Sequence, residues 1–345
     1  MTGFRFGMIG GAALALATSM FGTADAQAQS VVEKIKQRGY VSCGASTGVP
    51  GLSRADEKGV WRGFDSDVCR AFAVALFGDK DKIRFVPLVT AARLPAIQTG
   101  EIDVLSRTTT MTYTRDSAVR FTAITLYDND AILSWKKLNL KQIKDFDGAS
   151  FCVTGGGNLS EKSLTELEAE YKIKVKRVVF ESPAQSRDSY FAGRCDAYIT
   201  DGTSAAGAKV SVAKNPDDHE LMALTEHAPE PLGIAIPRGD DRWFDIVRWS
   251  IFALWWAEDN GVTSANIDEK LKTGDKNVQR VLGAVAGFGK PVGLDDKWVY
   301  NIIKQVGNYA EVWDRNLGQD SPIKLERKFN NLYKNGGLMF SPSWD

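Results

Sequence analysis

The chain of 345 residues contains only two histidines, His219 and His227. Histidine is the side chain most often used as a general base and is a frequent metal ligand, so its scarcity argues against a catalytic metal centre. Both histidines fall in residues 215–231, which read as a loop. The four cysteines also lack the C-x₂-C spacing that is typical of zinc sites. We therefore expect no metal and no cofactor.

The sequence also lacks an excess of charge of either sign. Lys and Arg number 43, and Asp and Glu number 43, so the formal net charge is zero. A neutral balance favours neither nucleic acid nor an anionic membrane surface as a partner. After the first 30 residues, no apolar run is long enough to span a bilayer. The apolar and charged fractions of 43% and 25% are ordinary for a globular protein.

The N-terminus has the pattern of a secretory signal peptide. Arg5 supplies a positive start, residues 8–20 are apolar, and two A-x-A cleavage patterns end at Ala26 and Ala28. We assign residues 1–28 to the signal peptide and expect a periplasmic protein. The mature chain is long enough for two domains with sizeable cores.

Four cysteines in an exported chain favour two disulfides, for which three connectivities are possible. Cys43 ends a strand-like run and Cys69 lies in the helix that follows. Cys152 lies in a later strand, and Cys195 directly precedes another. We predict the pairs 43–69 and 152–195, which keep each bridge within one domain. The alternative is four buried thiols.

Strands and helices alternate in two similar units, which predicts an α/β fold with parallel sheets. Extended segments at residues 128–135 and 231–237 bracket the second unit and suit two hinge strands. We predict two lobes with a ligand cleft between them. Lobe one comprises residues 29–131 and 236–345, and lobe two comprises residues 132–235. The tail carries an apolar stripe from Trp243 to Trp255 that should pack on lobe one, and further helices are predicted at residues 295–309 and 323–333.

Two strand ends carry complementary polar groups. Gly100-Glu-Ile-Asp103 leads through a short strand to Thr108, Thr110 and Arg115, and Gly193-Arg-Cys-Asp196 leads to Asp201. A guanidinium matches a carboxylate in bidentate geometry, and a carboxylate accepts from an ammonium group. Ligands of open α/β sheets bind at such carboxyl strand ends. The pair suits a zwitterion, of which the free α-amino acid is the commonest. The simpler alternatives are an exposed Thr-rich turn and an Asp201 helix cap.

Two further motifs have weaker meanings. Gly155-Gly156-Gly157-Asn158 joins a strand to a helix, where backbone N–H groups bind anions, although a plain tight turn explains it equally well. The run Gly44-Ala-Ser46-Thr-Gly48 matches the G-x-S-x-G nucleophile elbow. No helix is predicted after it, so we do not expect a serine hydrolase.

The sequence resembles the periplasmic solute-binding proteins of amino-acid ABC importers, family three, and within them the general L-amino-acid-binding subgroup. The resemblance spans the mature chain. It rests on Val41-Ser-Cys-Gly44, Gly63-Phe-Asp-Ser-Asp-Val-Cys69, Gly100-Glu-Ile-Asp-Val-Leu-Ser-Arg107, Gly193-Arg-Cys-Asp196, Gly239-Asp-Asp-Arg-Trp-Phe-Asp-Ile-Val247 and Gly307-Asn-Tyr-Ala-Glu-Val-Trp313.

The resemblance implies a hinged two-lobe fold of the type II periplasmic-binding-protein class. It assigns Thr108, Thr110 and Arg115 to the ligand α-carboxylate and Asp201 to the α-ammonium group. It adds contacts from Gly156, Gly157, Asn158, Arg93, Arg107 and Ser46. The chain departs from the family where Gly157-Asn158 replaces two threonines, which affects side-chain preference more than ligand class.

The expected function is therefore capture of a free L-amino acid, with polar or acidic side chains favoured, and delivery to an ABC permease in the inner membrane. We expect a monomer. The alternative is an enzyme on the same scaffold, similar to cyclohexadienyl dehydratases, which needs a general acid in the cleft. Asp201 is the one carboxyl group plainly placed for that role. The same cleft also suits a binding protein that is presented to a sensory receptor.

Overall fold

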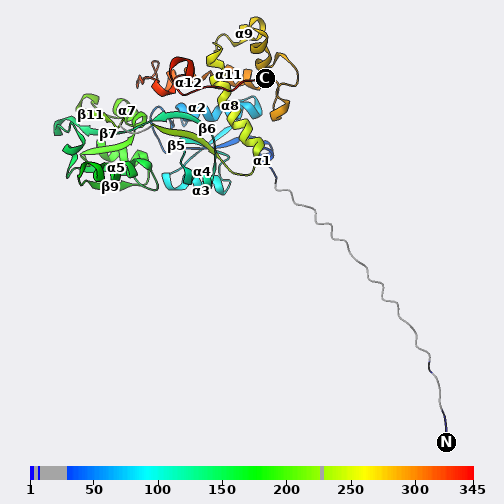
Figure 1. Ribbon diagram of the computed structural model, residues 1–345, viewed down its shortest axis with the longest axis horizontal. Helices are drawn as coiled ribbons and strands as arrows, with labels where there is room; N and C mark the ends of the chain where they lie inside the picture. Colours follow the sequence, from blue (N-terminus) through cyan, green and yellow to red (C-terminus); the bar gives the residue numbers. More distant parts are fainter. Residues whose placement is uncertain (4–6, 8–28, 226–228) are drawn as a thin grey trace.

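The computed structural model describes residues 1–3, 7, 29–225 and 229–345. The predicted signal peptide lies almost entirely outside these described residues. The chain forms two five-stranded sheets, each with its own helices (Figure 1). Among the described residues, no helix combines the length and the apolar character needed to cross a membrane.

The first sheet has the strand order β4-β1-β5-β12-β6. Every residue of β1 is buried, and β1 pairs in parallel with β4 and β5, as expected for a strand covered on both faces. β12 runs antiparallel to both β5 and β6. The strands are β1 (Val41–Ala45), β4 (Ile83–Pro87), β5 (Val104–Thr110), β6 (Arg120–Asp128) and β12 (Glu230–Ile236), and a small hairpin is formed by β2 (Arg54–Ala55) and β3 (Trp61–Arg62).

Helices that precede or connect these strands complete this half of the molecule. Ser30 caps the first helix by accepting from the backbone N–H of Glu33, and Gly39 ends it in the left-handed conformation. The helices are α1 (Val31–Arg38), α2 (Phe64–Phe77), α3 (Arg93–Gln98) and α4 (Tyr113–Ala118), with a 3₁₀ turn, η1 (Thr90–Ala92), before α3.

The second sheet has the strand order β11-β7-β10-β8-β9. β8 pairs in parallel with β9 and β10, whereas β7 runs antiparallel to β10 and β11. Its strands are β7 (Asp130–Trp135), β8 (Ser150–Thr154), β9 (Lys176–Phe180), β10 (Ala197–Asp201) and β11 (His219–Ala223), and its helices are α5 (Leu159–Tyr171), α6 (Pro183–Phe191) and α7 (Gly202–Ser211).

The chain passes between the sheets twice. Asn129 alone separates β6 from β7, and residues 224–229 separate β11 from β12. We propose that the lobes follow the two sheets. The predicted lobe boundaries then move, because β12, most of which was expected in lobe two, hydrogen-bonds to β5 and β6 of the first sheet.

The tail after β12 packs on the first sheet's side of the molecule (Figure 1). α8 carries the predicted apolar stripe, and its Trp243 is fully buried, with the indole N–H donating to the Asp103 carbonyl at 2.8 Å. The tail helices are α8 (Asp241–Asp259), α9 (Ile267–Thr273), α10 (Lys276–Gln279), α11 (Trp298–Val306) and α12 (Tyr309–Asn316).

The predicted helix at residues 323–333 is wrong. This stretch contains only short 3₁₀ turns, η7 (Lys328–Asn330) and η8 (Tyr333–Asn335). Lys324 and Lys328 have positive φ angles of 53° and 46°, which interrupt helical geometry. Long-range contacts of this segment, rather than local helix propensity, decide its conformation.

One of those contacts lies at the edge of the first sheet. The Asn330 side chain accepts from the Tyr127 N–H at 2.7 Å and donates to the Tyr127 carbonyl at 2.9 Å. Tyr127 belongs to β6, the edge strand that leads to the crossing at Asn129. A tail side chain therefore takes the place of a neighbouring strand there.

The cysteines pair as predicted, Cys43 with Cys69 and Cys152 with Cys195. Each bridge joins a strand to an element that packs against the same sheet, since Cys69 lies on α2 and Cys195 precedes β10.

Candidate functional site

The first part of the site lies at the end of β5. The Thr112 hydroxyl accepts from the Arg115 backbone N–H at 3.2 Å and so caps α4 directly after the strand. This tight strand-to-helix step brings the Arg115 guanidinium back to the strand end, where Nη1 donates to the Thr110 carbonyl at 2.9 Å. Thr108 has a φ of 39° and lies where the pairing of β5 with β12 shifts register. Such backbone strain in a β-branched residue is typical of functional sites.

Two more arginines approach from the same side. Arg107, on β5, donates through Nε to the Leu88 carbonyl at 3.1 Å and through Nη2 to the Thr90 hydroxyl at 3.2 Å. Arg93 opens α3 and is also buried. Burial lowers the pKa of Arg107 to about 10, and burial together with the charges of Arg107 and Arg115 holds the pKa of Arg93 well below its ordinary value. These guanidiniums are desolvated and gain free energy from any anion that reaches them.

Asp201 faces them from the second sheet. It ends β10 and precedes α7, but within the described chain its side chain makes no capping hydrogen bond to that helix. Asp128 takes the capping role instead, accepting from the Thr203 backbone N–H at 2.9 Å. The cap interpretation of Asp201 is therefore wrong. Burial, followed by the nearby charges of Asp128, Asp130 and Glu230, raises the pKa of Asp201 well above its usual range.

The glycine loop after β8 reaches across to the arginines. The Gly157 carbonyl accepts from Arg115 Nη2 at 2.7 Å and from Arg93 Nη2 at 3.2 Å. Gly156 has a φ of 74° and packs on Ala91, because a Cβ at Gly156 would lie 3.1 Å from the Ala91 backbone nitrogen. The Asn158 side chain caps α5 by accepting from the Ser160 N–H at 2.9 Å. Here the loop carbonyl, rather than an N–H, meets the guanidiniums.

These groups enclose a cavity of about 20 Å³ between the lobes, room for roughly one water molecule. Seven of the ten predicted ligand-binding residues line it: Arg93, Arg107, Thr108, Thr110, Arg115, Asn158 and Asp201. Gly157 reaches two of them through its carbonyl oxygen. Ser46 does not line this cavity; it is 2% exposed, and its hydroxyl has no hydrogen-bond partner among the described residues.

Sequence reasoning missed several lining residues, including Val49, Leu159, Pro183, Thr200 and Ser204. It also missed Glu230, which accepts a 2.6 Å hydrogen bond from the Thr110 hydroxyl. Burial and the charge of Asp130 raise the pKa of Glu230 to about 6, against the lowering effect of the Thr110 bond and Arg115. Nothing in the local sequence around Glu230 marks it, because its partner lies 120 residues earlier.

The part of the chain that the structure describes does not show the strand–turn–helix arrangement that the serine hydrolase alternative requires. After Ser46 the chain enters bends and the β2–β3 hairpin rather than a helix. His219 was expected in a loop but opens β11, where it is buried with Nδ1 2.7 Å from the Tyr190 hydroxyl. His227 lies outside the described residues. No group of three or more His, Cys, Asp or Glu suited to a metal ion occurs in the part of the chain that the structure describes.

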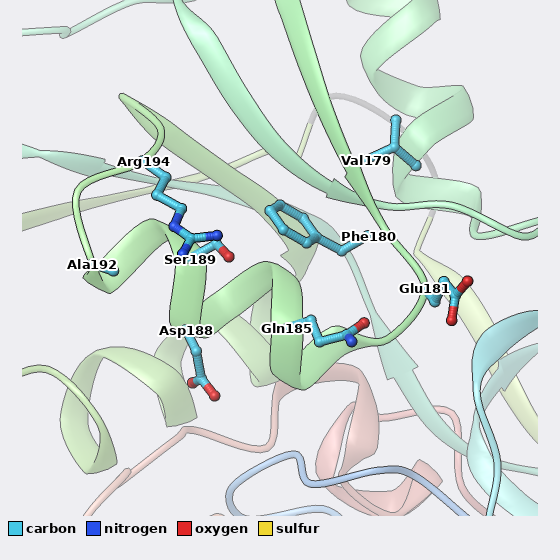
Figure 2. Close-up of a pocket in the computed structure, with 8 residues that line it drawn as sticks. All are labelled: Val179, Phe180, Glu181, Gln185, Asp188, Ser189, Ala192 and Arg194. Atoms are coloured by element: carbon cyan, nitrogen blue, oxygen red, sulfur yellow. The ribbon is translucent and has the colours of Figure 1, made fainter.

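A larger hollow of about 520 Å³ lies on lobe two alone, between β9 and α6 (Figure 2). Gln185, Asp188 and Ser189 line it from α6, and Arg194 lies beyond the helix end. None of the predicted site residues borders it. The inter-lobe cavity, where the charged side chains of both lobes converge, is the candidate ligand site.

The chain is similar to known transport proteins. Residues 41–286 match the family model of bacterial extracellular solute-binding proteins, family 3. The putative amino-acid ABC transporter-binding protein YhdW of Escherichia coli (strain K12) is 40% identical, over 96% of this chain and 97% of its own. The general L-amino acid-binding periplasmic protein AapJ of Rhizobium johnstonii is 39% identical, over 97% and 96%. A solved ABC transporter / periplasmic binding protein from Brucella ovis with glutathione bound is 38% identical, with a TM-score of 0.87 over 92% of this chain and all of that chain.

Proposed function

The chain belongs to the bacterial extracellular solute-binding proteins of family 3, and from that premise we propose that it captures a free L-amino acid for an ABC importer. The observation that carries the proposal is the inter-lobe cavity, in which three buried arginines of lobe one face Asp201 of lobe two. The disulfides support a periplasmic location, and the working partner is then a permease in the inner membrane. Relatives named as amino-acid transporter-binding proteins are in keeping with this role.

The ligand's common part binds at the two strand ends. Arg115, Thr108 and Thr110 hold the α-carboxylate, and Asp201 accepts from the α-ammonium group, whose positive charge offsets the cost of burying an ionised Asp201. In the structure the Gly157 carbonyl accepts from both Arg93 and Arg115. A ligand carboxylate replaces this neutral acceptor with a charged one and forms the stronger, charge-assisted hydrogen bonds.

The charge balance of the cavity favours a polar or acidic side chain. Three guanidiniums and one carboxylate line it, so an α-carboxylate and an α-ammonium group leave two arginines without an anion. We propose that Arg93, Arg107, Ser46 and the Gly156–Asn158 loop serve the ligand side chain, with a second carboxylate or an amide oxygen as the preferred acceptor. Glutathione, bound to the Brucella ovis relative, itself carries two carboxylates and one ammonium group.

Capture requires hinge opening, because a cavity of about 20 Å³ cannot admit an amino acid. Asn129, which alone separates β6 from β7, is a point about which the lobes can rotate. The ligand then shifts the population towards the closed form by touching both lobes at once.

Calorimetry with the twenty L-amino acids and glutathione tests the proposal. We expect a dissociation constant in the micromolar range, about −8 kcal/mol, for one or more of them. Arg115→Ala and Asp201→Ala should each weaken binding by at least about a hundredfold, because each leaves a buried ligand charge unpaired. Melting curves should stay close to that of the wild type.

The matched controls are Arg84→Ala, an exposed arginine on β4, and Asp217→Ala, an exposed aspartate before β11. Both should bind as the wild type does. Absence of binding by every compound would refute the proposed ligand class.

We propose binding rather than catalysis for this cleft. A cyclohexadienyl-dehydratase-like enzyme would need Asp201 to act as a general acid, the role that competes with accepting from an ammonium group. Turnover of prephenate or arogenate by the purified protein would favour the enzyme.

A further inference from the structure

Thr110 has a single hydroxyl proton, and a neighbouring carboxylate holds it. Thr110 Oγ1 donates to Glu230 Oε2 at 2.6 Å. A hydroxyl has one donor and two acceptor positions, whereas an ionised carboxylate can only accept. While Glu230 is ionised, Thr110 therefore offers the cavity only lone pairs. That is the wrong polarity for a ligand carboxylate, which needs donors.

We propose that Glu230 is a positioning residue that takes up a proton when a ligand carboxylate binds beside Thr110. The inference rests on the proposed function, since it requires a carboxylate-bearing ligand in this cavity. The proton comes from solvent and adds to one Glu230 oxygen. The new O–H donates to Thr110 Oγ1, and the Thr110 hydroxyl turns its own proton to the ligand. No other bond forms or breaks.

Charged groups on five surrounding elements affect the protonation of Glu230. Arg115 on α4 and Arg93 on α3 favour its ionised form, while Asp130 on β7, Asp128 on β6 and Asp201 on β10 disfavour it. Glu166 of α5 borders the same small cavity of about 40 Å³ as Glu230 and Asp130. Glu230 thus interacts both with the arginines of the candidate site and with Asp128 and Asp130 on either side of Asn129.

A bound carboxylate raises the pKa of Glu230. It adds a negative charge and neutralises Arg115, one of the groups that favour ionised Glu230. The pKa of Glu230 is about 6 in the closed structure without a ligand, so a further rise moves its titration through neutral pH. Ligand binding and protonation then reinforce each other, as linked equilibria must.

The sign of the pH dependence follows. The complex holds one more proton than the free protein, so affinity rises as pH falls. Above the free-state pKa of about 6, the affinity should weaken by as much as tenfold per pH unit. The dependence ends at the higher pKa of Glu230 in the complex.

The test is calorimetry of L-glutamate binding at pH 7 in two buffers of different ionisation enthalpy, which counts protons taken up. Glu230→Gln is the test variant, because the glutamine amide donates to Thr110 as a protonated carboxyl group would. We expect the wild type to take up close to one proton more per ligand than Glu230→Gln. At pH 8, Glu230→Gln should bind several-fold tighter than the wild type.

Other carboxyl groups, Asp201 above all, also exchange protons with the ligand, so the difference between wild type and variant is the informative quantity. The matched control is Glu220→Gln on β11, whose carboxylate pairs with Lys141. It should behave as the wild type does. Equal proton uptake in wild type and Glu230→Gln overturns the inference while leaving amino-acid binding intact.

Infrared difference spectra of the wild type, with isotope-labelled glutamate residues, keep the inference testable if the variant does not fold. A protonated carboxyl band should appear when L-glutamate binds, and its absence would count against proton uptake at Glu230. If L-glutamate binds to neither wild type nor variant, the acidic-ligand preference in the proposed function has failed, and the inference fails with it.

Discussion

Asp65 has a buried environment in the structure that its sequence context does not indicate. It precedes an apolar run, a position that is typical of a helix-capping aspartate. In the structure the helix begins at Phe64, Gly63 is the N-cap, and Asp65 is buried inside the first turn. Its carboxylate accepts from the Ser106 hydroxyl at 3.3 Å. Burial raises its pKa to about 7, although hydrogen bonds from Ser106 and Thr108 and the charge of Arg107 oppose the rise.

Asp65→Asn should therefore change how stability depends on pH. The folded pKa of about 7 exceeds the ordinary aspartate pKa of 3.8, so the folded state holds the proton longer as pH rises. The free energy of unfolding of the wild type should fall between these two values, by at most about 1.4 kcal/mol per pH unit from this group. The variant should lack that contribution. Denaturant unfolding at pH 5 and pH 8 measures the difference.

The exposed Asp81 provides the control, since Asp81→Asn should keep the wild-type slope. Identical slopes for Asp65→Asn and the wild type would contradict the assignment.

At the residue scale, the site could be predicted where chemistry is local. Thr110 ends β5 and Arg115 follows in the next helix, and the hydrogen bond between them spans five residues. The alternative interpretation of Asp201 as a helix cap is wrong because Asp128 supplies the cap. Asp128 lies 75 residues before Thr203, whose N–H it accepts from. Glu230 was missed for the same reason, and the sequence gives no spacing rule for such partners.

At the scale of elements, α5 begins at the candidate ligand site. The Asn158 side chain accepts from the Ser160 N–H and caps the helix, and Asn158 also borders the inter-lobe cavity. One side chain thus serves helix stability and lies beside the proposed ligand.

Asn158→Asp should separate these two roles. Aspartate is an equally good N-cap and interacts favourably with the helix dipole, so the melting temperature should hold or rise slightly. Its negative charge beside the cavity should weaken L-glutamate binding roughly tenfold. Calorimetry and thermal melting of the same sample give both quantities.

Asn158→Ala is the counterpart. It removes the cap and should lose about 1 kcal/mol of stability without adding charge. Tighter L-glutamate binding by Asn158→Asp than by the wild type would speak against an anion beside this position.

Elements with strong periodicity were predictable and the others were not. α1 has both of its boundaries in the local sequence, since Ser30 caps its start and Gly39 ends it. β6 was missed although Thr122, Ile124 and Tyr127 favour a strand, because its partner β12 lies more than 100 residues later and pairs with register shifts. β11, with the sequence His-Glu-Leu-Met-Ala, has no strand pattern of its own and exists because β7 offers it an edge.

At the scale of the whole molecule, a few hydrogen bonds hold the lobes together. Besides the arginine bonds to Gly157, Arg187 Nη1 of α6 donates to the Gly48 carbonyl of lobe one at 2.5 Å. The Arg187 side chain is only 11% exposed, so this bond is largely shielded from water. Arg187 is not among the residues that line the inter-lobe cavity, so we expect it to affect closure rather than direct contact with the ligand.

Arg187→Ala should favour the open form. A hydrogen bond from a charged donor contributes about 1.5–3 kcal/mol, so the ligand should dissociate at least about tenfold faster. The ligand-free protein should have a larger radius of gyration. Small-angle scattering and stopped-flow fluorescence measure these two effects.

Arg177→Ala is the control, because Arg177 pairs with Glu168 inside lobe two. It should leave both quantities unchanged. Wild-type dissociation kinetics in Arg187→Ala would remove this residue from the closure mechanism.

The Asn330 contact with Tyr127 bears on how the chain avoids self-association. An uncovered edge strand is a template for pairing with other chains. Here the end of β6 is satisfied by Asn330, which is synthesised 203 residues after Tyr127. Until residue 330 is synthesised, this part of the border of the first sheet is uncovered, and a chain in that state is open to pairing with other chains. The tail thus covers part of the first sheet's edge as well as extending its core.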